Sequence, residues 1–115
     1  MGSTSYSSGG AQTSQPKFAA ISASSNGNNT LVAAVTGKKI RVLSYALTSS
    51  GTVNAKFQSG ASGTDLTGLL YEIANSGIAV AYCPVGLFET AAGSLLNLNL
   101  TAGTAVGGHL TYVEV

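Results

Sequence analysis

The fold class is decided by one short stretch, Leu96-Asn97-Leu98-Asn99-Leu100, in which leucine and asparagine alternate strictly. A strand places successive side chains on opposite faces, whereas a helix would spread these leucines around its circumference. The stretch therefore predicts a strand with its leucines in the core and with Asn97 and Asn99 facing solvent. On this interpretation an Asn97→Thr substitution is tolerated.

The same pattern of short strands and turns runs through the chain from Phe18 onward. Apolar and β-branched runs alternate with Gly, Asn and Ser at a spacing of roughly 8 to 12 residues, and no window favours a helix. The other expected strands cover residues 30–36, 38–48, 52–58, 69–74, 78–82 and 106–115. About eight short strands at this spacing predict an all-β sandwich or barrel.

Local signals add detail to this pattern. The turn Asn75-Ser76-Gly77 predicts a β-hairpin between the strands on either side of it. The pair Gly107-Gly108 predicts a bulge or bend within the last strand. Alternation within residues 52–58 predicts an inward set and an outward set, Val53, Ala55 and Phe57 against Asn54, Lys56 and Gln58.

The range 38–48 is different, because its second half is apolar on both faces. Strict alternation divides it into Ile40, Val42, Ser44 and Ala46 on one face and Leu43, Tyr45 and Leu47 on the other. Such a strand is either central in a buried sheet or in contact with a neighbouring subunit.

Charge is scarce in this chain. Its 115 residues include 5 basic and 4 acidic residues, or 8% charged, against about 25% in ordinary soluble domains. A net charge of +1 gives no electrostatic footprint for nucleic acid, since affinity for phosphates rises with the number of Lys and Arg contacts. The only cationic cluster, Lys38, Lys39 and Arg41, is interpreted as a solvated strand start in which Lys39 and Arg41 share a face.

The N-terminal residues have another composition. Residues 2–15 hold seven Ser or Thr and three Gly, with Tyr6 and Ala11 as the only apolar side chains. Such a segment cannot bury enough surface to offset the entropy lost on ordering its backbone. We therefore expect a flexible arm over residues 1–17 and one β-sandwich domain over residues 18–115.

Residues with catalytic or ligand chemistry are few. His109 is the only histidine and no Gly-x-Ser-x-Gly motif accompanies it, so we expect a hydrogen-bonded histidine at a strand edge or subunit contact. Cys83 is the only cysteine, which excludes an intrachain disulfide and predicts a small buried hydrophobe. The acids offer no close pair, and Glu89 and Glu114 are interpreted as surface carboxylates; the four are Asp65, Glu72, Glu89 and Glu114. We expect no catalytic, cofactor-binding or metal-binding residue, and no enzyme.

Targeting signals are also missing from the sequence. No basic residue precedes Lys17, and no apolar run approaches the roughly 18 residues of a membrane-spanning helix. We therefore expect a protein with no membrane partner and no export by the usual route, and the single cysteine, Cys83, separately indicates synthesis in a reducing compartment.

Three stretches resemble small virion proteins of tailed phages. They are Gly37-Lys38-Lys39-Ile40-Arg41-Val42, Phe88-Glu89-Thr90-Ala91-Ala92-Gly93-Ser94-Leu95-Leu96-Asn97-Leu98, and Val106-Gly107-Gly108-His109-Leu110-Thr111-Tyr112. The likeness covers about residues 30–115 and is strongest to the trimeric jelly-roll decoration, or cement, proteins on the outside of icosahedral heads. It implies a jelly roll, a homotrimer, the major capsid protein as partner, and a place on the outer capsid surface after synthesis in the host cytoplasm.

The composition agrees in kind with this resemblance. Interface cores are depleted of charge, and a closed ring of subunits covers sheet edges that otherwise invite aggregation. The expected role is structural: trimers bridge capsid subunits and stiffen the head against the pressure of internal DNA. The alternative is a receptor- or glycan-binding domain of a phage fibre or tail protein, although Trp is absent and four tyrosines fall in expected strands, Tyr45, Tyr71, Tyr82 and Tyr112.

Overall fold

The computed structural model describes residues 15–115, so almost all of the predicted arm, residues 1–17, lies outside the described residues. The described residues form ten strands: β1 Lys17–Ala23, β2 Gly27–Val32, β3 Ile40–Ser49, β4 Val53–Ser59, β5 Thr64–Asp65, β6 Leu70–Glu72, β7 Gly77–Val80, β8 Phe88–Glu89, β9 Leu96–Leu100 and β10 Val106–Glu114. Eight of them have three or more residues. Within this range no helix has the length and hydropathy of a membrane span.

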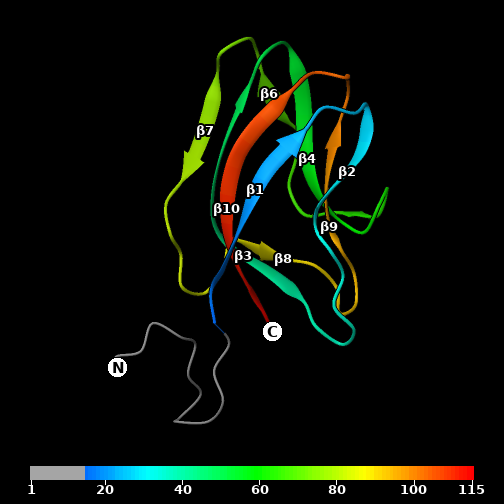
Figure 1. The fold of residues 1–115 in the computed structure, drawn as a ribbon, viewed down its shortest axis with the longest axis vertical. Helices are drawn as coiled ribbons and strands as arrows, with labels where there is room; N and C mark the ends of the chain where they lie inside the picture. The colour runs from blue at the N-terminus through cyan, green and yellow to red at the C-terminus, as the bar shows by residue number, and fades with distance from the viewer. Residues whose placement is uncertain (1–14) are drawn as a thin grey trace.

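The strands form two antiparallel sheets that face each other across one core (Figure 1). The first sheet has the order β1-β10-β3-β7, and β8 also pairs with β3. The second has the order β2-β9-β4-β5, and β6 also pairs with β4. The predicted all-β class is therefore confirmed, and the two layers have the character of a β-sandwich.

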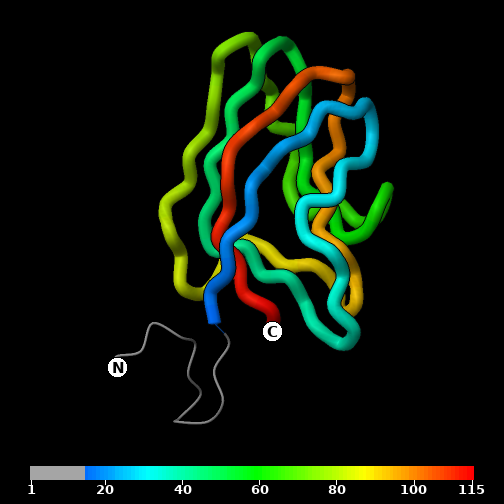
Figure 2. Tube along the Cα trace, in the orientation of Figure 1, coloured from blue at the N-terminus to red at the C-terminus, as the bar shows by residue number. Residues whose placement is uncertain are grey.

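The chain changes sheet at most of its turns, as the trace in Figure 2 shows. The predicted hairpin at residues 75–77 is wrong for this reason, because β6 pairs with β4 and β7 pairs with β3 in the other sheet. Asn75 does reverse the chain, with a φ of 63°. Turn residues specify the reversal, whereas the partner of each flanking strand is decided by packing.

The core is filled by the inward side chains of both sheets. Leu96, Leu98 and Leu100 are at most 1% exposed, so their predicted inward face is confirmed. The predicted inward set of β4, Val53, Ala55 and Phe57, is buried as well. At the centre, the Phe57 ring packs against two other aromatic rings, with centroids 4.9 Å from Tyr45 and 5.0 Å from Phe88, and those two are themselves 6.2 Å apart.

β3 is central in the first sheet, between β10 and β7, which confirms the first of the two alternatives predicted for this strand, and a β-bulge explains its two-faced pattern. Ser44 lies opposite Thr111 and Val42 opposite Tyr112, so Leu43 has no partner in β10. The extra residue shifts the alternation by one position. As a result, four residues from both sides of the bulge join the same core, Ile40, Val42, Tyr45 and Leu47. The two-faced pattern of this strand therefore requires no neighbouring subunit.

The glycine pair of β10 has a different role from the predicted bulge. The register against β3 runs unbroken from Val106 to Thr111, through Gly107 and Gly108. Gly108 has a φ of 154°, and a Cβ there would lie 1.9 Å from the carbonyl oxygen of Ala46. Glycine is therefore needed at position 108 because the backbone of β3 approaches it closely.

We predict that Leu98→Ala lowers the free energy of unfolding by about 2 to 5 kcal/mol, since it removes a fully buried side chain and leaves a cavity. Leu95→Ala is the matched control, because Leu95 precedes β9 and is not a member of the core cluster. Urea unfolding of both variants should show a clearly smaller loss for Leu95. Equal losses would contradict the assignment of Leu98 to the core.

Candidate functional site

A network of amide side chains covers the outer face of the second sheet. Asn97 is 0% exposed, although the alternation of β9 had predicted that it faces solvent. Its Nδ2 donates to Asn28 Oδ1 and to Gln58 Oε1, each at 2.9 Å, and its Oδ1 accepts from the backbone N–H of Asn29 at 2.9 Å. Gln58, also expected in solvent, is 4% exposed. Both exposure predictions are therefore wrong, although both residues do lie on the outward face.

The network continues to the end of the sheet. Gln58 Nε2 donates to Asp65 Oδ1 at 2.9 Å, and Lys56 lies 3.2 Å from the same carboxylate. The hydrogen bond from Gln58, with a further one from Lys56, lowers the pKa of Asp65. On the other side, Asn28 exchanges two hydrogen bonds of 2.9 Å with Ser62. The amides satisfy one another within the chain, so this face reinforces the sheet and leaves few polar groups for a ligand.

A second polar cluster joins β3 to β8. Arg41 donates to Glu89 Oε1 from Nε at 2.8 Å and from its terminal nitrogen at 2.7 Å, while Lys39 lies 3.3 Å from Oε2. The prediction that Lys39 and Arg41 share one face is thereby confirmed. The stem of Arg41 is covered by Gly86, where a Cβ would lie 2.5 Å from Arg41 Cγ. The hydrogen bond from Arg41 holds the pKa of Glu89 below its ordinary value, and Lys39 adds to this lowering against the opposing effect of partial burial.

The four acids do not meet. Asp65 and Glu89 lie in the two clusters above, Glu114 pairs with Lys17 at 3.1 Å, and Glu72 lies apart from all three. Glu72 is 3% exposed and accepts a hydrogen bond of 2.7 Å from the hydroxyl of Ser76. Burial, and secondarily the charge of Glu72, raise the pKa of Tyr45.

Glu72 is a buried acid that sequence reasoning missed. A signal was available, because Glu72 is two residues from Leu70 and shares its inward face on β6. Alternation read through the expected strand at 69–74 would have placed both side chains between the sheets.

The other reactive side chains are isolated. His109 is exposed on β10, between β1 and β3, so it does not lie on a terminal strand, and the alternative of a subunit contact stays a prediction. Cys83 is free and only half-buried, less than expected of a small core residue. Across residues 15–115, no three His, Cys, Asp or Glu side chains gather as metal ligands.

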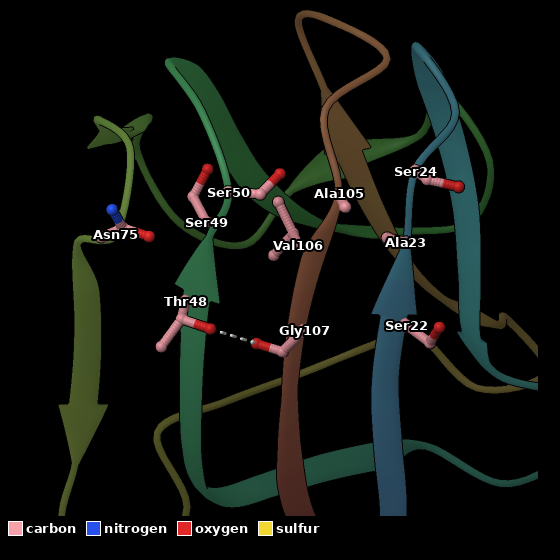
Figure 3. Close-up of a pocket in the computed structure, with 10 residues that line it drawn as sticks. All are labelled: Ser22, Ala23, Ser24, Thr48, Ser49, Ser50, Asn75, Ala105, Val106 and Gly107. Atoms are coloured by element: carbon pink, nitrogen blue, oxygen red, sulfur yellow. Dashed lines mark hydrogen bonds between the residues drawn. The ribbon is translucent and has the colours of Figure 1, made fainter.

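An open hollow lies at one end of the first sheet, where β1 and β3 end and β10 begins (Figure 3). It has a volume of about 660 Å³, and its polar lining consists of hydroxyl and amide groups, Ser22, Ser24, Thr48, Ser49, Ser50 and Asn75. Thr48 already donates to the carbonyl of Gly107, at 3.5 Å. Since the lining includes no charged, aromatic or titrating side chain, it offers no general acid or base and no platform for a sugar ring.

The most distinctive surface is formed by residues 69–85, a segment that we call the apolar edge. Six large apolar side chains are exposed among the described residues, and five belong to this segment: Leu69, Tyr71, Ile73, Tyr82 and Val85. The segment includes β6 and β7, and β7 is the terminal strand of the first sheet (Figure 1). The five side chains come from both sheets, since β6 belongs to the second sheet, and from the loop that follows β7. Exposed apolar side chains that gather in one patch are typical of interaction surfaces.

The apolar edge also lacks exposed charge. Its single ionisable acid, Glu72, is buried, and β7 consists of Gly77, Ile78, Ala79 and Val80. Soluble proteins usually protect a terminal strand with Lys, Pro or a bulge, and β7 has none of these. The arrangement suits contact with another protein.

Comparison with known proteins gives no relative: no family model, no curated protein and no solved structure matches this chain.

We predict that Asn97→Thr destabilises the protein by about 1 to 3 kcal/mol, because it leaves the N–H of Asn29 and Gln58 Oε1 without their partner, while Gln58 Nε2 keeps its bond to Asp65. Asn54→Thr is the matched control, since Asn54 lies on the neighbouring strand β4 and its side chain takes no part in the network. Urea unfolding should show a change within about 0.5 kcal/mol for the control. Two small, equal changes would mean that water replaces the network without cost.

We predict that the stability difference between the native protein and Glu89→Gln depends on pH. A lowered pKa means that the ionised Glu89 stabilises the fold above the unfolded-state pKa of about 4.3, and that this contribution is lost as the pH falls through the lower folded-state pKa. The native protein should therefore be the more stable at pH 7, with the difference shrinking between about pH 5 and pH 3. Urea unfolding at three pH values measures this. A difference independent of pH would refute the ionic role of Glu89.

Proposed function

We propose that this protein is a structural component of a phage virion, a decoration or cement protein that binds the outer surface of the head as a homotrimer. The observation that carries the proposal is the apolar edge, an uncharged surface with exposed Tyr71, Ile73 and Val85 beside an unprotected terminal strand. A small β-domain with this surface gains stability by assembling. The resemblance of residues 30–115 to decoration proteins supplies the kind of assembly.

We further infer a jelly-roll topology, and the strand orders support it. Set side by side, β1-β10-β3-β7 and β2-β9-β4-β6 place chain neighbours at equivalent positions in the two sheets: β1 with β2, β10 with β9, β3 with β4, and β7 with β6. A chain that runs in this way as a folded ribbon of eight strands forms two Greek keys, the arrangement of a double-sheet jelly roll. The short strands β5 and β8 are additions to this plan.

The partner on the head is proposed to be the major capsid protein. Charge supports a protein partner rather than nucleic acid, because most of the few cations are already paired: Lys17 with Glu114, Lys39 and Arg41 with Glu89, and Lys56 with Asp65. Neutralising phosphates requires free Lys and Arg side chains. Several contacts per trimer would raise the avidity for the shell without strong individual bonds.

We predict that the isolated protein sediments as a trimer at micromolar concentration and that its melting temperature rises with protein concentration, since subunit contacts stabilise the folded state. Added to expanded heads that lack it, the protein should bind in saturating amounts. Deletion of residues 2–15 should leave the melting temperature unchanged and lower the occupancy of heads.

A glycan array is the control for the alternative function. Binding to specific glycans, together with no binding to heads, would contradict decoration and favour a receptor-binding domain of a fibre or tail. Unchanged occupancy after the deletion would show that the arm has no part in attachment.

A further inference from the structure

The turn between β1 and β2 contains a chemically reactive pair, Asn26 followed by Gly27. Asn26 is exposed, and its side chain forms no hydrogen bond with residues 15–115. Asparagine is one of the thermolabile residues, and a following glycine has no side chain to hinder attack by its backbone nitrogen. The sequence has seven asparagines, and only Asn26 is followed by glycine.

The backbone of the turn requires the glycine of this pair. Gly27 has a φ of 92°, a conformation that residues with a side chain rarely adopt. A Cβ at this position would meet nothing within 4 Å, so the space around Gly27 is open. The fold therefore fixes the residue that makes its neighbour reactive, and it leaves room for the reaction.

We propose that Asn26-Gly27 is a site of spontaneous modification, at which Asn26 becomes aspartate or isoaspartate without an enzyme. The Gly27 nitrogen gives its proton to a solvent base and bonds to Asn26 Cγ. The bond from Cγ to Nδ2 breaks, and Nδ2 takes a proton from solvent and leaves as ammonia. One water molecule then opens the cyclic succinimide. Opening between Cγ and nitrogen gives aspartate, and opening between the main-chain carbonyl carbon and nitrogen gives isoaspartate.

Other asparagines lack this combination of features. Asn75 is the closest comparison, since it is exposed and its side chain forms no hydrogen bond with the described residues. However, the N–H of Ser76 donates to the carbonyl of Ile73 at 3.1 Å, so the attacking nitrogen is held in place. Asn97 is fully buried, and both ends of its amide are hydrogen-bonded. Modification of the folded protein should therefore be selective for Asn26.

The isoaspartate product changes the length of a turn that Asn29 closes. Asn29 Oδ1 accepts from the N–H of Ser25 at 3.2 Å, and its Nδ2 donates to the carbonyl of Ser25 at 2.9 Å. The same Nδ2 donates to the carbonyl of Leu98 on β9. Isoaspartate adds one carbon atom to the backbone between Ser25 and Asn29, which displaces these partners. It should loosen β2, the terminal strand of the second sheet, whereas aspartate keeps the backbone length.

The modification also changes the charge of the protein. Either product is a carboxylic acid that is ionised at neutral pH. A fifth acid would stand against five basic residues, so the net charge falls from +1 to 0. Proteins with a net charge near zero associate and precipitate more readily. An aged sample of this protein is therefore expected to be less soluble than a fresh one.

The test is a prolonged incubation of the full chain in mildly alkaline buffer, with a parallel sample unfolded in urea. Peptide mass spectrometry locates each deamidated asparagine, and enzymatic methylation quantifies isoaspartate. We expect Asn26 to carry most of the modification in the folded protein, and Asn75 to react mainly in urea. The proposal is overturned if Asn26 reacts in urea but stays intact in the folded chain, or if Asn75 keeps pace with it there.

Two variants at position 26 complete the experiment. Asn26→Gln keeps an exposed amide but would have to close a larger ring, so it should stay unmodified over the same incubation. Asn26→Asp adds the charge with a normal backbone, so its urea midpoint should match that of the native protein. Chains with isoaspartate, separated by ion exchange, should unfold at a lower urea concentration than Asn26→Asp. Equal midpoints would refute the loosening of the turn.

Discussion

A side chain in a strand faces one side of its sheet, and β3 meets this constraint by leaving Leu43 without a partner in β10. Ile40 and Val42 precede the bulge and Tyr45 and Leu47 follow it, yet all four enter the same core. Because β3 pairs with β10, β7 and β8, the phase of its side chains fixes the inner face of the whole first sheet. Without the unpaired residue, one half of this strand would present its apolar side chains to solvent.

In the second sheet, hydrogen bonds from side chains add to the backbone pairing between β2 and β9. Asn97 accepts from the backbone N–H of Asn29, and the Asn29 amide in turn donates to the carbonyl of Leu98 at 3.2 Å. These bonds attach the terminal strand β2 to β9 through amides as well as through backbone pairing. In this chain of few charges, asparagine side chains thus hold the terminal strand of the second sheet in place.

The sequence predicted the face that each side chain occupies wherever a strand alternates regularly between apolar and polar residues. It assigned the leucines of β9 and the inward set of β4 to the core because a clean period of 2 leaves one choice of face. It failed at Leu43, where a single bulged residue reverses the phase, and at Asn97, where neighbouring amides bury an outward side chain. Both failures depend on residues distant in sequence, which no local pattern contains.

Less of the candidate site was open to prediction. The shared face of Lys39 and Arg41 followed from their spacing, but their common partner Glu89 is 48 residues beyond Arg41 and comes close only through the pairing of β8 with β3. The apolar edge was hidden for another reason. Tyr71 and Ile73 fell in an expected strand whose apolar residues occupy both faces, and such a sequence does not state which face remains uncovered.

The pairing of nearly every charge with an opposite neighbour has a kinetic consequence. Local pairs cancel at a distance, so the molecule has almost no long-range electrostatic field to steer a partner toward it. Encounters are then limited by diffusion and orientation, at about 10⁵ to 10⁶ M⁻¹s⁻¹, the range of unsteered protein association. The same absence of a field makes the rate of any association nearly independent of ionic strength.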